Sequence, residues 1–317
     1  MRFHPALNKL WNRLWKKTPE NVFNKVLSSP KPYEIVKMKS DAIEIYHCTD
    51  KGLVRELNED ALASDSNLGL VVLADGMGGC QAGEVASRLA VDTVMQDMWQ
   101  PRKKIDHHPL IKNKNNGLHR VSILLEQAVI KANQVIFQES ETNISRHGMG
   151  TTVVTAIFEQ DFISIVHIGD SRLYRLRGDE FKLLTKDHSI VQELVDCGLY
   201  TEEEAHSAPQ RHLLTRALGV AADVIVDVQE QFTLAEDIYL FCSDGLSDML
   251  RNEEIAQIIK NSRDDLERGV RELVDAANFN GGVDNISVAL VRILPNSNYP
   301  RQWWHKLFSG SKKWLVW

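Results

Sequence analysis

Residues 152–184 read TVVTAIFEQDFISIVHIGDSRLYRLRGDEFKLL, and this stretch decides the fold class. It contains short runs of β-branched and aromatic residues bounded by Asp, Gly and Ser, a pattern typical of strands joined in hairpins or a meander. The runs do not alternate strictly with helices, as a doubly wound parallel sheet would require. The stretch therefore favours antiparallel sheets covered by helix pairs.

Similar patterns continue on both sides of this stretch. The runs that predict further strands are Leu70–Ala74, Ile238–Cys242 and Ile286–Ile293. Amphipathic spacing predicts helices over residues 81–99, 118–139, 252–260 and 264–277. The polar segment 101–117 is expected to form an exposed loop, and the polar, helical segment 190–213 is expected to form a surface flap.

Charge divides the 317 residues into three parts. Residues 1–40 carry nine Lys or Arg against two Glu, and residues 295–317 carry four Lys or Arg and no acid. The net charge of −6 therefore leaves −17 on residues 41–294. We expect a catalytic domain over 41–294, a basic amphipathic extension and linker over 1–40, and a basic, Trp-rich tail over 295–317. The acidic balance excludes a general nucleic-acid binder.

The four cysteines form no C-x-x-C pair, and no run approaches 18 apolar residues. The first residues lack the h-region of a secretory signal, so we expect a reducing, cytoplasmic location. The two basic ends, which contain Trp11, Trp15 and several C-terminal Trp residues, leave three alternatives open. They could fold back onto the acidic body, contact an anionic membrane surface, or dock a protein partner.

One chemical pattern recurs along the chain: an apolar strand meets an Asp beside a Gly or Asn. It occurs as VVLADGMGG (71–79), VHIGDSRLY (166–174), LFCSDGLSD (240–248) and DNISVALVRI (284–293). A carboxylate at a strand end is held rigidly and points into a cleft, while the Gly lets the backbone turn. Each acid alone is more often a turn residue.

Several such acids in one cleft would repel one another, and cations would relieve that repulsion. Hard Mg²⁺ and Mn²⁺ prefer oxygen ligands of this kind. The chain shows no Cys/His cluster with zinc-ligand spacing. The pattern therefore indicates a site for hard divalent cations.

The chain also resembles the metal-dependent protein phosphatases of type 2C. The resemblance covers about residues 46–293 and rests on eight motifs in the family's order: RELNED (55–60), DGMGG (75–79), GTT (150–152), GDSR (169–172), TKDHS (185–189), LTRALG (214–219), SDGLSD (243–248) and DNISV (284–288). It implies a four-layer α/β/β/α sandwich of class α+β, with two antiparallel sheets packed face to face and flanked by helix pairs.

The resemblance also implies roles for single residues. Asp75 would bridge two Mn²⁺ or Mg²⁺ ions; Glu59 and the carbonyl of Gly76 would complete one site, and Asp244 and Asp284 the other. The remaining implied roles belong to three residues: Asp60 would orient a water on the metals, Arg55 would grip the substrate phosphate, and Asp170 would help to hold a third, weaker ion.

The implied function is hydrolysis of phosphoserine and phosphothreonine in proteins by a metal-activated water, opposing a serine/threonine kinase. A monomer is expected. Two alternatives stay open: a phosphopeptide-binding scaffold without chemistry, and an enzyme for small phosphate esters. Met77 stands where eukaryotic members often carry a His that could protonate the leaving group, and Met is common in bacterial members.

Other residues in or beside the motifs are expected to be structural. We expect hydrogen-bonding roles for His147, His188 and His212, and packing roles for Thr151, Thr152 and Cys80. Thr215 and Arg216 are expected to brace the cleft or the flap. For Asp248 two roles are balanced, a place near a metal and a helix N-cap.

Overall fold

A computed structural model describes residues 33–78, 82–102, 117–159 and 161–295. The chain divides into two compact units, Met1–Glu34 and Ile35–Trp317, and the described residues lie almost entirely in the second. The predicted N-terminal amphipathic helix, the Trp-rich tail and Cys80 lie outside the described residues. Most of the predicted 101–117 loop does so too.

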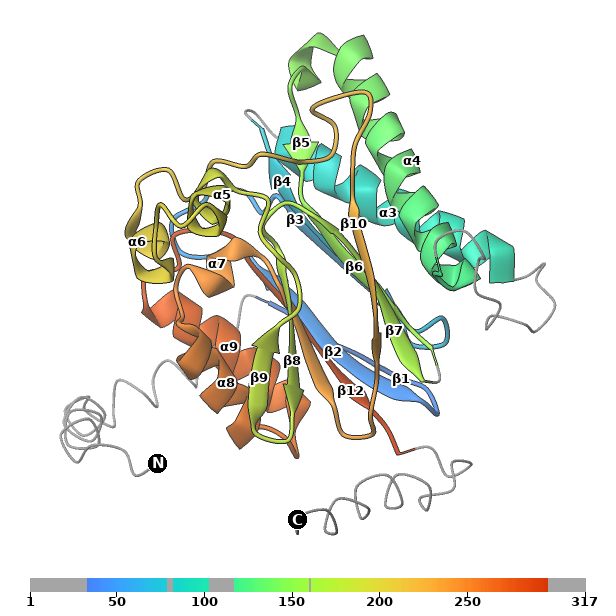
Figure 1. Cartoon of the computed structure of the whole chain (residues 1–317), viewed down its shortest axis with the longest axis vertical. Helices are drawn as coiled ribbons and strands as arrows, with labels where there is room; N and C mark the ends of the chain where they lie inside the picture. The colour runs from blue at the N-terminus through green and yellow to red at the C-terminus, as the bar shows by residue number, and fades with distance from the viewer. Residues whose placement is uncertain (1–32, 79–81, 103–116, 160, 296–317) are drawn as a thin grey trace, which may run out of the picture. The chain divides into compact units, whose positions relative to one another are not determined.

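Two six-stranded antiparallel sheets form the centre of this unit (Figure 1). The first has the order β1 (Val36–Lys39), β2 (Ile43–Asp50), β12 (Ile286–Ile293), β11 (Ile238–Cys242), β8 (Arg172–Arg177) and β9 (Glu180–Leu183). The second has the order β10 (Asp227–Phe232), β7 (Phe162–Ile168), β6 (Val153–Phe158), β4 (Leu70–Met77) and β3 (Asp60–Asp65), with β5 (Gly150–Thr151) paired to β4.

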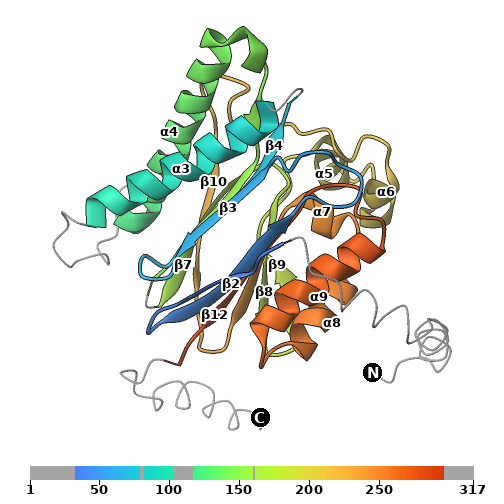
Figure 2. The ribbon, with the colours of Figure 1, turned by 180° about the vertical axis from the view of Figure 1, so that it is seen from behind.

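Helix pairs cover the outer face of each sheet (Figures 1 and 2). Helices α3 (Ala82–Arg102) and α4 (Arg120–Thr142) pack on the second sheet, while α8 (Asn252–Asn261) and α9 (Leu266–Phe279) lie against the first. Short elements complete the unit: η1 (Ile144–Arg146), α5 (Ile190–Asp196), α6 (Glu202–Ser207) and α7 (Asp244–Ser247). This arrangement confirms the predicted four-layer sandwich.

Two apolar cores explain why the central strands read as continuous hydrophobic runs. Side chains such as Val154, Ile165 and Phe241 fill the space between the sheets, whereas Val153 and Val166 face α3 and α4. Strands β6 and β7 are therefore buried on both faces, which removes the alternation of a half-exposed strand. Burying two layers of side chains in this way is the main driving force for the fold.

The structure corrects several local predictions. Asp75 does not follow its strand but lies inside β4, whereas Asp244 follows β11 as predicted and is the first residue of α7. Within the flap, residues 190–213, only α5 and α6 are helical. Asp248 is not the N-cap of α8, because that helix starts at Asn252 after Arg251.

Candidate metal and phosphate site

One end of the sandwich carries an acidic cleft of about 520 Å³. In an antiparallel sheet the start of one strand lies beside the end of its neighbour, so the segments before β3, β8 and β12 meet the segment after β11. The carboxylates that line the cleft are Glu59, Asp75, Asp170, Asp244, Asp248 and Asp284. Arg55 and Gly76 line it as well, whereas Asp60 lies buried beneath the lining. All the predicted site residues thus lie in or directly beneath one cleft.

Asp75 is fixed through its backbone. Its amide donates to Thr152 Oγ1 at 3.1 Å, and its carbonyl accepts from the Thr152 amide at 2.9 Å and from Thr151 Oγ1 at 2.8 Å. Both threonines are fully buried, which confirms their predicted packing role. Burial first, and then the charges of Asp60 and Asp244, hold the pKa of Asp75 well above its usual range.

Asp60 lies directly across the strand pair from Asp75. Like charges at such directly opposed positions destabilise a sheet. Burial raises the pKa of Asp60 to about 6, although Ser243 Oγ donates to its Oδ2 at 2.8 Å. Its Oδ1 is buried and has no hydrogen-bond partner among the described residues. The pair therefore places two carboxyl groups with raised pKa values directly opposite each other.

Asp244 and Asp170 approach the cleft from the first sheet. Burial, followed by the charges of Asp170 and Asp248, holds the pKa of Asp244 well above its usual range. Its Oδ1, in the lining of the cleft, is buried without a hydrogen-bond partner in the described part of the chain, as is Asp60 Oδ1 beneath the lining. Burial and the charge of Asp187 raise the pKa of Asp170 to about 7. A buried carboxylate oxygen without a hydrogen-bond partner indicates that a ligand binds to it.

Glu59 directly precedes β3, and its carboxylate lies against the first residues of α3, where the backbone amides of Gly83 and Glu84 donate to it. Burial nevertheless raises its pKa. Gly76 fits here because a Cβ at that position would lie 2.1 Å from the Gly83 carbonyl oxygen and 2.5 Å from that of Glu59. The close backbone approach of Gly76 to Gly83 and Glu59 thus needs glycine.

Arg55 and Asp284 come together from segments 229 residues apart, with Arg55 Nη2 donating to Asp284 Oδ2 at 2.7 Å. The Arg55 side chain is 52 % exposed, so its remaining donors face the open cleft. Asn285 joins the same two segments: its Oδ1 accepts from the Glu59 amide at 2.8 Å, and its Nδ2 donates to the Lys51 and Leu57 carbonyls. The positioning role of Asn285 was not predicted, although Asn285 lies within the DNISV motif (284–288).

The flap adds a basic edge that the sequence analysis did not predict. Arg211 and His212 line the cleft, with Arg211 Nε 3.3 Å from Asp248 Oδ2. His212 Nδ1 lies 3.5 Å from Asp248 and 3.9 Å from Asp244. The adjacent basic residues of QRH (210–212) were the signal that could have indicated this edge.

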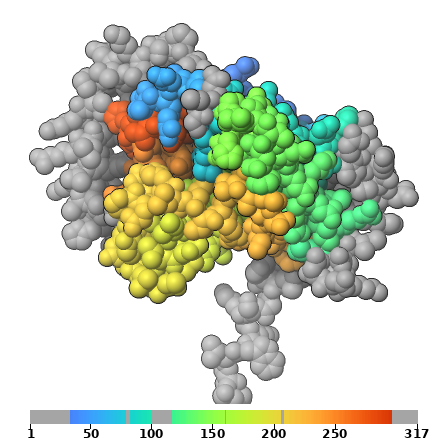
Figure 3. All heavy atoms as spheres, turned by 90° about the horizontal axis from the view of Figure 1, so that it is seen from above, coloured from blue at the N-terminus to red at the C-terminus, as the bar shows by residue number. Residues whose placement is uncertain are grey.

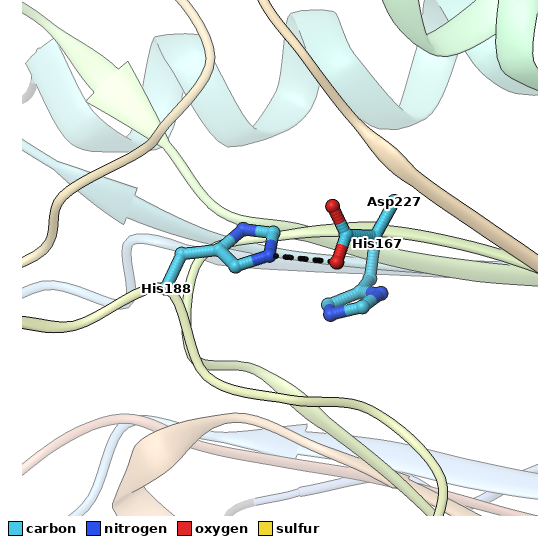
Figure 4. Close-up of side chains that lie close together, drawn as sticks. All are labelled: His167, His188 and Asp227. Atoms are coloured by element: carbon cyan, nitrogen blue, oxygen red, sulfur yellow. Dashed lines mark ion pairs between the residues drawn. The ribbon is translucent and has the colours of Figure 1, made fainter. Parts of the chain in front are cut away.

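Figure 4 shows a second cluster of polar side chains, formed by His167, His188 and Asp227. The two imidazole rings stack at 4.8 Å between centroids, so their lone pairs do not converge on one point. His188 Nδ1 accepts from the Gly169 amide at 3.1 Å, which places the ring proton on Nε2, 3.4 Å from Asp227 Oδ2. This tautomer cannot ligate a metal through Nε2. The cluster is therefore structural, as predicted for His188.

The cleft, by contrast, suits hard cations well. It offers carboxylate oxygens from both sheets, of which Asp244 Oδ1 is buried without a hydrogen-bond partner, and no cysteine or unobstructed imidazole pair among its described lining residues. Oxygen-only donor sets favour Mg²⁺ and Mn²⁺ over zinc. Together with the exposed guanidinium, the fold and the cleft define a metal-dependent phosphatase.

Comparisons with known proteins agree with that class. Residues 51–279 match the family model described as protein phosphatase 2C. A serine/threonine phosphatase, stp, of Listeria monocytogenes is 36 % identical over 246 residues, covering 77 % of this chain and 93 % of the relative. The chain belongs to the protein phosphatase 2C family and is a metal-dependent protein phosphatase.

Solved structures show the same similarity. The Mycobacterium tuberculosis serine/threonine phosphatase PstP/Ppp superposes with a TM-score of 0.70 at 36 % identity, covering 80 % of this chain and 100 % of that one. A second PstP catalytic-domain structure, described as a complex with two manganese ions, gives a TM-score of 0.69 at 34 % identity and covers 80 % and 99 %.

Proposed function

We propose that this protein hydrolyses phosphoserine and phosphothreonine in other proteins at a binuclear Mn²⁺ or Mg²⁺ centre in the acidic cleft. The observation that carries the proposal is the set of partly buried, mutually repelling carboxylates beside the exposed guanidinium of Arg55. Two bound divalent cations would lower the pKa of a water to near neutrality and offset charge on the phosphoryl oxygens. The manganese-bound PstP relative supports this choice of cofactor.

Five residues would supply the ligands of the two ions. Asp75, held centrally by Thr151 and Thr152, would be shared by both ions. Glu59 and the Gly76 carbonyl would complete one ligand set, and Asp244 and Asp284 the other.

Two further residues support this core. Asp60 would orient the attacking water from below, since its free Oδ1 lies behind Asp75. Asp170, whose carboxylate reaches the cleft beside Asp244, would help to hold a third, weaker ion.

Arg55 would bind the substrate phosphate. Its guanidinium already donates to Asp284, which fixes it at the edge of the cleft with donors to spare. A planar fork of N–H groups matches phosphate oxygens and stabilises their charge during transfer. No cysteine is needed as nucleophile, and burial raises the pKa values of Cys48 and Cys242 to about 12, which makes both inert.

The wider setting follows from the same chemistry. A serine/threonine kinase must supply the phosphorylated substrates, and a monomer suffices because the described cleft is built from one chain. We place the catalytic domain at 41–294 between basic ends, in a reducing cytoplasm. No described helix is long and apolar enough to cross a membrane.

The decisive experiment compares the full-length protein with Asp244→Asn. The wild type should hydrolyse para-nitrophenyl phosphate and phosphothreonine peptides with Mn²⁺ and stop in EDTA. The variant should lose at least about 100-fold in rate while giving an unchanged circular dichroism spectrum. A variant with full activity would show that Asp244 is no ligand. Phosphopeptide binding without turnover in the wild type would favour the scaffold alternative.

A further inference from the structure

Two loops beside the cleft expose apolar side chains on a rigid backbone. Residues 51–57 and 278–285 lie next to each other, in blue and orange-red, across a hollow from the yellow flap (Figure 3). Their exposed members are Leu53 at 68 %, Val54 at 64 %, Val283 at 47 % and Leu57 at 41 %. We call these four side chains the apolar rim. Exposed apolar groups that gather beside a functional cleft mark interaction sites more often than scattered ones do.

Hydrogen bonds hold this rim in place. The Leu53 and Val54 amides donate to the Gly282 carbonyl at 2.7 and 3.2 Å, and Asn285 Nδ2 ties the Lys51 and Leu57 carbonyls together at 2.9 Å each. The loops approach so closely that a Cβ on Gly52 would lie 2.2 Å from the Asp284 carbonyl oxygen. The apolar side chains are therefore presented on an ordered platform, so binding would order few further groups.

The rim is continuous with the phosphate site. Val283 lines the cleft and directly precedes Asp284, while Val54 directly precedes Arg55 in the other loop. Extended chain advances about 3.3 Å per residue, so a peptide whose phosphate reaches Arg55 places its next two or three residues over these loops. The occupant that this geometry favours is the flanking sequence of the substrate.

We propose that the apolar rim selects phosphoprotein substrates that carry a large aliphatic side chain within two residues of the phosphorylated serine or threonine. The inference rests on the proposed function, because it places the phosphate at Arg55. It adds a specificity determinant that the cleft carboxylates cannot supply, since these groups contact only the phosphate end. Covering Leu53 and Val283 with an aliphatic side chain would remove apolar surface from water on both partners.

The test compares two phosphothreonine peptides that differ only at the two positions on each side of the phosphate, Leu in one and Ser in the other. The wild type with Mn²⁺ should show a kcat/KM about tenfold higher for the Leu peptide. Leu53→Ser should bring the two peptides close to parity and leave para-nitrophenyl phosphate hydrolysis unchanged. Leu199→Ser is the matched control, because Leu199 is equally exposed at 68 % and belongs to neither of the two loops that carry the rim.

A wild-type ratio near one, or an equal ratio in Leu53→Ser and the wild type, would overturn the proposal. So would a dimer in sedimentation velocity that Leu53→Ser abolishes, because the rim would then bind a second copy. Fluorescence anisotropy of both labelled peptides on the Asp244→Asn background repeats the comparison without turnover. A Leu preference there that Leu53→Ser removes supports the rim even if hydrolysis fails, which separates this inference from the proposed activity.

Discussion

Neutralising Asp60 should stabilise the metal-free protein at neutral pH, against the usual expectation for a buried-residue substitution. Asp60 lies opposite Asp75 in the β3–β4 pair, is 8 % exposed, and keeps one carboxylate oxygen without a partner in the described chain. In Asp60→Asn the amide oxygen can still accept from Ser243 Oγ, and the amide nitrogen faces the Asp75 carboxylate. The substitution therefore removes a repelling charge and keeps the local hydrogen bond.

The magnitude follows from the pKa. Burial raises the pKa of Asp60 from 3.8 to about 6, and each pKa unit corresponds to about 1.4 kcal/mol, so ionised Asp60 costs about 3 kcal/mol in the folded state. The cost is absent below pH 3.8, where the acid is protonated in both states. It grows as pH rises, because the unfolded chain ionises first, and is complete above about pH 6. Near pH 7.5, Asp60→Asn should raise the Tm of the chelated protein by about 5–10 °C.

The assay is thermal unfolding in EDTA at pH 4 and pH 7.5, followed by titration with Mn²⁺. The variant should exceed the wild type only at the higher pH, and Mn²⁺ should stabilise the wild type more, because cations offset the repulsion that the variant no longer has. Asp264→Asn, at an exposed aspartate, is the control and should change neither value. Wild type and Asp60→Asn curves that stay parallel from pH 4 to pH 7.5 would refute the reasoning.

Two further predictions concern the edge and the back of the cleft. In steady-state kinetics, Arg55→Lys should lower kcat/KM on phosphopeptides about tenfold and Arg55→Ala about 100-fold. The loss is smaller in Arg55→Lys because Lys keeps the positive charge but not the planar guanidinium, which also donates to Asp284. Full activity in Arg55→Lys would contradict this prediction. His188→Asn should keep activity within about threefold, since its amide oxygen can replace Nδ1 as acceptor for Gly169, whereas His188→Gln should lose about tenfold. Equal losses in both would show that the Gly169 hydrogen bond does not position Asp170.

The fold was largely predictable because its signals are local. The apolar runs of β6 and β7 and the amphipathic periods of α8 and α9 follow from side-chain chemistry within a few residues. Boundaries were less predictable: β4 continues through Asp75 to Met77 because Gly150 and Thr151 pair with it, a contact that no local pattern announces. The flap kept only two short helices, since its two ends bond to each other: the Ile190 amide donates to the Leu213 carbonyl.

The sequence by itself indicated Asp75, Asp244 and Asp284 as candidate site acids, since each lies where an apolar run meets a Gly or Asn, a pattern of neighbouring residues. Only the tertiary structure decided that these acids share one cleft with Arg55, that one carboxylate oxygen in the cleft and one beneath it are buried without a hydrogen-bond partner, and that Leu53 lies beside Gly282 on an exposed rim. The physical reason is the sequence separation over which each kind of interaction acts. Strand and turn preferences act between neighbours, whereas charge repulsion, desolvation and apolar exposure depend on which distant segments the sheets bring together.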